Sequence, residues 1–74
     1  MNIEHLIIMA NQIGDFFGAN PDKDLAQQEI VEHLKKFWAK QMREQLQMHI
    51  NKHVDTGLHP VVESAIKNYS QLYM

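Results

Sequence analysis

Apolar side chains recur three and four positions apart along this chain, and short stretches rich in glycine, proline and asparagine interrupt them. That spacing is the period of one face of an α-helix, whereas a half-buried strand would alternate apolar and polar residues. No stretch of the sequence shows such alternation. The sequence therefore predicts an all-α fold, a small bundle of three or four helices that forms a single helical domain over residues 1–74.

The first two helices have recognisable start and stop signals. The first is predicted over residues 3–17, with Asn2 as its N-cap. It ends at Gly18, because glycine tolerates a left-handed turn and Pro21 disfavours helix in the residue before it. Pro21 suits the first position of a second helix, with Asn20 as the cap, and we expect that helix to reach at least Trp38.

The chain after Trp38 allows two arrangements. Ala39 and its neighbours include no helix breaker, which is consistent with one helix running to about Val54. A new apolar stripe starts at Met42, which is equally consistent with a kink near Ala39. Residues 55–57 end whichever helix is present, and Pro60 opens the last helix.

The size of the chain limits the core and the cofactors that it can hold. A chain of 74 residues buries only about 60% of the surface that its unfolded form exposes, so such domains often depend on a metal, a disulfide or a partner. The absence of cysteine excludes disulfides, thiolate zinc sites and iron–sulfur clusters of its own. No glycine-rich phosphate loop is present either, and we expect this chain to hold no cofactor.

Two histidines raise the question of a metal site. His49 and His53 lie four positions apart, a spacing that presents two imidazoles on one helical face. A zinc protease would need glutamate directly after the first histidine, and Ile50 stands there. A third ligand would have to come from His33, Asp55 or His59. We favour the simpler interpretation of two exposed histidines near a helix C-terminus, where partial positive charge suits the dipole.

Catalytic patterns are weak. Ser64 and Ser70 lie in ordinary helical sequence without an elbow motif, and Asp22 and Asp24 suit a helix N-terminus without any catalytic role. A nucleophile also needs a base and an orienting group in fixed geometry, and no such set can be named. We therefore expect a protein that is not an enzyme by itself.

The charge distribution suggests a binding surface. The first 34 residues are acidic and the rest of the chain is basic, with a basic cluster around Trp38 formed by Lys35, Lys36, Lys40 and Arg43. The isoelectric point of about 6.2 lies well below the value of about 9 that is typical of nucleic-acid-binding domains. Nucleic-acid binding is therefore disfavoured, and an adaptor that uses this cluster to bind nucleic acid or a second copy of itself is kept as the alternative function.

The N-terminal stretch predicts neither export nor a membrane span. Glu4 and His5 stand where a signal peptide would carry basic residues. The apolar run over residues 6–10 is far shorter than the roughly 20 residues that a membrane helix needs. We expect a cytoplasmic protein without a membrane partner.

Several short motifs together resemble one family. Met9-Ala10-Asn11-Gln12-Ile13-Gly14-Asp15-Phe16-Phe17 places two polar residues and a glycine inside an apolar helix, where the glycine costs about 1 kcal/mol relative to alanine. It is followed by His33-Leu34-Lys35-Lys36-Phe37-Trp38, by Met42-Arg43, and by Gly57-Leu58-His59-Pro60-Val61-Val62. In order and spacing these blocks resemble the delta subunit of NAD-dependent, molybdenum-containing formate dehydrogenases, over about residues 3–66.

This resemblance implies an accessory subunit. In that family the alpha subunit carries the molybdenum centre and iron–sulfur clusters, and the beta and gamma subunits pass electrons to NAD. The delta subunit is thought of as a small helical clamp on the alpha subunit that assists cofactor insertion or stabilises the complex. The sequence departs from the family pattern after Trp38, where relatives usually carry an acidic residue, proline and arginine in place of Ala39, Lys40 and Gln41.

The expected partner-binding residues combine both lines of argument. Aromatic and basic side chains near Trp38 are suited to the centre and rim of an interface, and the amides of the first motif are suited to polar contacts with a partner backbone. The predicted partner-binding residues are Asn11, Gln12, Phe37, Trp38, Lys40, Met42 and Arg43. Because Met42 is followed at once by Arg43, we expect Trp38 to be an exposed anchor rather than a core residue.

Overall fold

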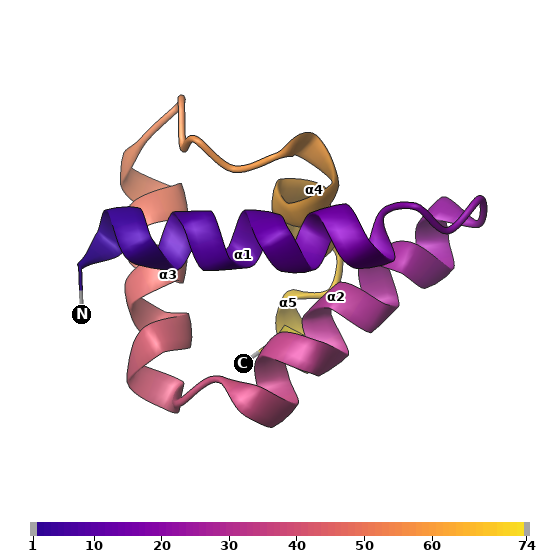
Figure 1. Cartoon of the computed structure of the whole chain (residues 1–74). Helices are drawn as coiled ribbons and strands as arrows, with labels where there is room; N and C mark the ends of the chain where they lie inside the picture. Colours follow the sequence, from indigo (N-terminus) through magenta and orange to yellow (C-terminus); the bar gives the residue numbers. More distant parts are fainter. Residues whose placement is uncertain (1, 74) are drawn as a thin grey trace.

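The computed structural model describes residues 2–73, in which the regular elements are all helices. Four helices form the body, α1 (Ile3–Phe17), α2 (Lys23–Phe37), α3 (Lys40–Lys52) and α4 (Pro60–Asn68), and the short α5 (Ser70–Tyr73) follows. Figure 1 shows α1 crossing in front of α3 and α4, with α3 near one of its ends and α2 near the other. The prediction of an all-α bundle is confirmed.

The first helix ends where predicted, but the reason for glycine at its end differs from the prediction. The first helix has the predicted bounds, and the Asn2 side chain accepts a hydrogen bond from the Glu4 amide at 2.8 Å. Gly18, however, has a φ of −66°, so its role is not that of a left-handed cap. A Cβ on Gly18 would instead collide with the Gly14 carbonyl oxygen. Glycine is thus required at this helix end for space.

The second helix begins two residues later than predicted. Asp22 is its N-cap and accepts a hydrogen bond from the Leu25 amide at 3.2 Å, so the prediction of Asn20 as the cap is wrong. Asn20 instead accepts from the Asp22 amide at 3.0 Å, which shapes the turn ahead of the helix. A carboxylate cap also suits the positive end of the helix dipole better than an amide does.

Trp38 and Ala39 interrupt the helix and separate α2 from α3. Of the two predicted arrangements, the structure therefore has the kink near Ala39 and not the continuous helix. Both residues are extended, with φ and ψ of −88° and 139° for Trp38 and −63° and 151° for Ala39. The second helix therefore ends at Phe37, one residue before its predicted minimum. The break brings Leu34 of α2 and Leu46 of α3 into one core, which a straight continuous helix would carry apart. No proline is needed to produce it.

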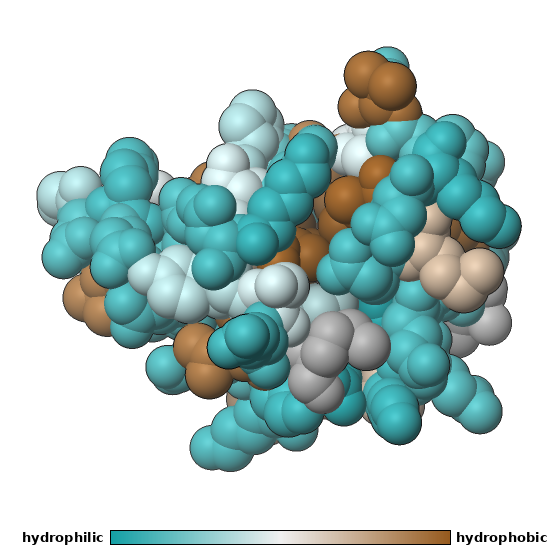
Figure 2. Space-filling model, turned by 180° about the vertical axis from the view of Figure 1, so that it is seen from behind, coloured by the Kyte–Doolittle hydropathy of each residue, from teal (hydrophilic) through white to brown (hydrophobic). Residues whose placement is uncertain are grey.

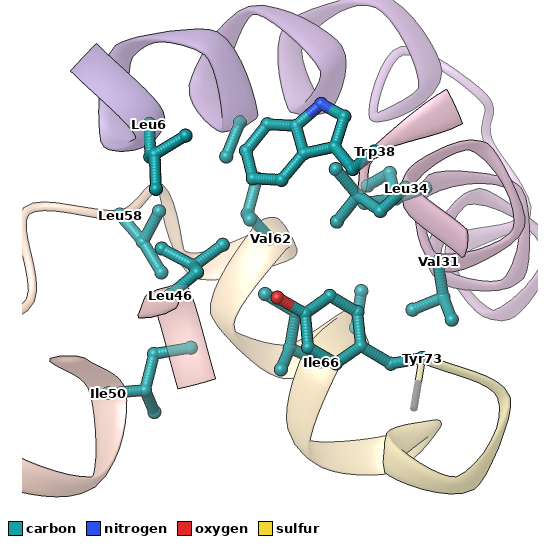
Figure 3. Close-up of a cluster of buried hydrophobic side chains, with 13 residues drawn as sticks. Leu6, Val31, Leu34, Trp38, Leu46, Ile50, Leu58, Val62, Ile66 and Tyr73 are labelled. Carbon is teal, nitrogen blue, oxygen red and sulfur yellow. The ribbon is translucent and has the colours of Figure 1, made fainter. Parts of the chain in front are cut away.

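The core draws on every helix. Among its fully buried members are Leu6 of α1, Val31 of α2, Leu46 of α3 and Val62 of α4. The C-terminal α5 adds Tyr73, whose side chain is fully buried. Figure 3 shows the rings of Trp38 and Tyr73 projecting into this shared interior, beside side chains such as Leu34 and Ile66.

Two of the sequence motifs pack against each other. Asn11 of α1 donates a hydrogen bond to the Gly57 carbonyl at 3.0 Å and accepts one from the His59 amide at 2.8 Å. Asp15, one turn further along α1, pairs with the His59 ring at 2.9 Å. Gly57, with a φ of 80°, adopts the left-handed conformation that suits glycine. These contacts fix the loop between α3 and α4 onto α1.

None of the helices in the described part of the chain combines the length and the apolar character needed to cross a bilayer. Seen from behind in Figure 2, the surface is largely hydrophilic, with hydrophobic side chains in small separate patches.

Candidate partner-binding groove

An open apolar groove of about 550 Å³ lies between α1 and the junction of α2 with α3. One wall is the face of α1 that runs from Met9 to Phe17, and the other comes from the end of α2 and the start of α3. The lining side chains are Met9, Gln12, Ile13, Phe16, Phe17, His33, Phe37, Trp38 and Met42. Four of the seven predicted partner-binding residues lie in this groove, namely Gln12, Phe37, Trp38 and Met42.

Aromatic rings line the groove in a row. Phe16 and Phe17 meet edge to face with centroids 5.0 Å apart, and His33 lies 5.6 Å from Phe17 and 4.7 Å from Phe37. Phe16 is 75% exposed and Phe37 is 65% exposed. Exposing two large rings that flank one groove is unfavourable in water. Such an arrangement is typical of a surface that a partner covers.

Trp38 has a different position from the one that the charge pattern favoured. It is 6% exposed and packs in the core, so the expectation of an exposed anchor is wrong for the isolated chain. The extended backbone at Trp38 turns its indole inward, while Phe37, one position earlier, points outward. Part of the indole still contributes to the groove lining. Whether Trp38 contacts a partner stays a prediction.

Arg43 is also buried rather than displayed in a basic surface cluster. It is 7% exposed, and its guanidinium donates a hydrogen bond to the Tyr73 carbonyl at 2.7 Å. The Tyr73 hydroxyl donates in return to the Arg43 carbonyl at 2.7 Å. Burial of this phenol raises the pKa of Tyr73 far above its ordinary value. The pair fastens α5 to α3, so Arg43 supports the fold of the isolated chain.

The two remaining predicted residues lie outside the groove lining. Asn11 is committed to the loop between α3 and α4, so both of its side-chain groups are occupied within the chain. Lys40 is exposed in the first turn of α3, two residues before Met42. Of the predicted basic cluster, the lysines Lys35, Lys36 and Lys40 are exposed and Arg43 is not.

The flank of the groove beside Phe17 is acidic. A shallow pocket of about 200 Å³ adjoins the groove and is lined by Phe17, Glu29, Glu32, His33 and Lys36. Glu29 accepts a hydrogen bond from Asn20 at 3.2 Å, and the Lys36 ammonium lies over the Phe37 ring, 5.6 Å from its centroid. The Glu32 side chain is exposed and makes no ion pair or hydrogen bond with any of residues 2–73.

The histidines do not converge on a metal site. His49 uses its Nε2 in a 2.9 Å hydrogen bond with the Thr56 carbonyl, and His53 Nδ1 bonds the His49 carbonyl at 3.1 Å. Their rings stack with centroids 4.4 Å apart. No cluster of three or more potential ligands occurs within residues 2–73. These contacts account for both side chains as ties between α3 and its following loop.

A family model describes most of this chain. It is the model of FdsD, the delta subunit of NADH-dependent formate dehydrogenase, and it matches residues 5–66 of 74. The chain belongs to the FdsD family. The resemblance carried by the sequence motifs is thereby confirmed. Comparison with curated proteins and with solved structures gives no match.

The matched FdsD region explains why its motifs occur together. Its first block and the block from Gly57 to Val62 face each other, with Asn11 on the loop backbone and Gly14 against Val62. A Cβ on Gly14 would approach the Val62 side chain within 3.0 Å, a distance that real Cβ atoms essentially never show. The glycine that weakens the helix in isolation therefore permits close packing of α1 on α4.

Several groove residues of this FdsD chain were not predicted as binding residues. Met9, Ile13, Phe16, Phe17 and His33 all line the groove. Phe16 carried a usable signal, because it falls off the main apolar stripe of α1 and would have to face solvent or a partner. His33 carried none, since a lone histidine between Glu32 and Leu34 is equally typical of a solvated helix face.

Proposed function

We propose that this FdsD-family chain is a non-catalytic accessory subunit that binds the molybdenum-containing alpha subunit of a soluble NAD-dependent formate dehydrogenase. The observation that supports the proposal most strongly is the apolar groove with its exposed rings, Phe16 and Phe37. Aromatic side chains dominate the binding energy of many interfaces. A chain of this size gains stability when such a surface is covered.

The role that follows is to stabilise the complex or to assist insertion of the molybdenum cofactor into the alpha subunit. The chain offers side chains for recognition, and its clearest concave surface is apolar. In this proposal the catalytic groups and redox centres belong to the other subunits, in the cytoplasm.

Affinity purification from the native host tests the proposal. The tagged full-length chain should co-purify with a formate dehydrogenase alpha subunit identified by mass spectrometry. Nucleic acid should not accompany it, because the isoelectric point of about 6.2 lies well below the value of about 9 that is typical of nucleic-acid-binding domains. Recovery of nucleic acid without the alpha subunit, with affinity falling steeply as salt rises, would contradict the proposal and favour the alternative function.

A further inference from the structure

We propose that the groove accepts one amphipathic α-helix of the alpha subunit and that a lysine or arginine of this helix pairs with Glu32. The inference depends on the proposed function and specifies the chemistry of the segment that binds.

The walls of the groove favour a helical occupant. They are formed by α1, α2 and α3, together with Trp38 between α2 and α3, so most of their backbone amides and carbonyls bond within helices. An extended peptide would find no strand edge to pair with, and its buried backbone groups would lose their hydrogen bonds with water. A helix satisfies its backbone internally and presents side chains alone, as in other helix-in-groove complexes.

The extent of the groove also suits a helix. The lining face of α1 runs from Met9 to Phe17, which corresponds to about 12 Å at a rise of 1.5 Å per residue. That is roughly two helical turns, long enough to contact partner residues at positions i, i+3 or i+4, and i+7. Phe16 and Phe37 project from the two sides and would enclose these apolar residues.

Charge complementarity places a cation at the Phe17 end of this helix. Two carboxylates, Glu29 and Glu32, and one ammonium group, Lys36, line the adjoining pocket. Lys36 lies over the Phe37 ring and Glu29 accepts a hydrogen bond from Asn20, whereas the Glu32 carboxylate makes no ion pair or hydrogen bond with a described residue. A partner cation beside Glu32 would form an ion pair partly shielded from water by the docked helix, where the pairing is stronger than on an open surface.

Photo-crosslinking of the complex tests the helix. Full-length chain carrying p-benzoyl-phenylalanine at position 16 is bound to the purified alpha subunit, irradiated and digested, and the crosslinked peptide is identified by mass spectrometry. We expect one alpha-subunit segment with helical apolar spacing and a lysine or arginine near it. The same probe at Met48, which is 54% exposed on α3 outside the groove lining, should not mark that segment.

Charge reversal tests the ion pair in the same complex. Glu32→Lys should weaken binding at least tenfold, whereas Glu44→Lys, an equal charge change at an exposed site on α3, should change it less than twofold. Reversing the identified cation to glutamate should restore the affinity of Glu32→Lys. Equal effects of the two substitutions, or a crosslink to a second copy of the chain or to a non-helical segment, would overturn the inference. Failure of the unmodified chain to bind any alpha subunit would instead overturn the proposed function.

Discussion

Gly14 allows α1 to lie close to α4, because glycine has no Cβ atom that would contact Val62. A Cβ there would come too close to Val62, a fully buried and β-branched residue that has little rotamer freedom. Helix propensity alone favours alanine by about 1 kcal/mol, whereas overpacking typically costs 1–3 kcal/mol. The two effects oppose each other. Because a Cβ at position 14 would lie so close to the Val62 side chain, we expect the cost of overpacking to exceed the gain in helix propensity.

Gly14→Ala should therefore lower the free energy of unfolding by about 1 kcal/mol or more, measured by urea denaturation. In a Val62→Ala background, where the clashing methyl group is missing, the same substitution should be neutral or stabilising. A double-mutant cycle separates the coupling from the cost of the cavity. Stabilisation by Gly14→Ala in the unaltered chain would contradict the close packing.

Trp38 and Phe37 are neighbours with opposite surroundings. Trp38 is buried in the core and Phe37 is 65% exposed at the groove. Truncating a core tryptophan costs about 3–5 kcal/mol, and each kcal/mol lowers the melting temperature of a domain this small by about 4–8 °C. Trp38→Ala should therefore melt more than about 12 °C lower, while Phe37→Ala should melt almost unchanged by circular dichroism. An unchanged melting temperature for Trp38→Ala would show that the indole is not part of the core.

Among the helices, the sequence predicted both ends of α1 and the start of α4, because amphipathic stripes, glycine and proline are strong local signals. The break at Trp38 and Ala39 was left open, since it depends on α2 and α3 sharing one core and not on a breaker residue. Gly18 was predicted as the end of the first helix but for the wrong reason, and Asp22 was missed as a cap. Gly18 is needed for space against the Gly14 carbonyl, and Asp22 accepts from the Leu25 amide ahead of the nearby Asn20.

The sequence predicted only part of the candidate site, because residue type alone does not show where a side chain finds its partner group. Sequence chemistry identified Phe37 and Met42, which line the groove, but also Asn11 and Arg43, whose partners lie 46 and 30 positions away in the chain. A polar residue in an apolar helix indicates a partner group without saying whether that group belongs to the same chain. Only the packing of α1 on the later loop settles this for Asn11.

The attachment of α5 should give stability a distinctive alkaline dependence. Burial holds the pKa of Tyr73 above its ordinary value, whereas in the unfolded chain the phenol ionises near about pH 10. Above that pH the unfolded state binds fewer protons than the folded state, so the free energy of unfolding falls as pH rises. Below it, this contribution is fully present.

Tyr73→Phe should flatten the fall in stability above about pH 10, as measured by urea denaturation at a series of pH values. The slope carries the test, because losing the hydrogen bond to the Arg43 carbonyl lowers stability at every pH. Tyr69→Phe provides the comparison, and it should flatten the fall in stability less than Tyr73→Phe does. The pKa of Tyr69 is also raised, by its hydrogen bond to Asp24, but the side chain is only half-buried. Identical slopes for the unaltered chain and Tyr73→Phe would contradict the buried phenol.

The two sides of α1 make different contacts in the folded chain. On one side of α1, Asn11, Gly14 and Asp15 tie the helix to the loop and to α4. On the other side, Gln12 and Phe16 line the groove. One helix thus serves both the stability of the fold and, in our proposal, recognition of the alpha subunit.

The most direct test of this account is the affinity of the full-length chain for the purified alpha subunit, compared with that of a Phe16→Ala/Phe37→Ala variant. Both rings are exposed, so the variant should melt within a few degrees of the unaltered chain. We expect its dissociation constant in isothermal titration calorimetry to rise at least tenfold, while Met48→Ala, an exposed apolar residue elsewhere, leaves it unchanged. Equal affinity of the double variant and the unaltered chain would contradict the assignment of the groove as the binding surface.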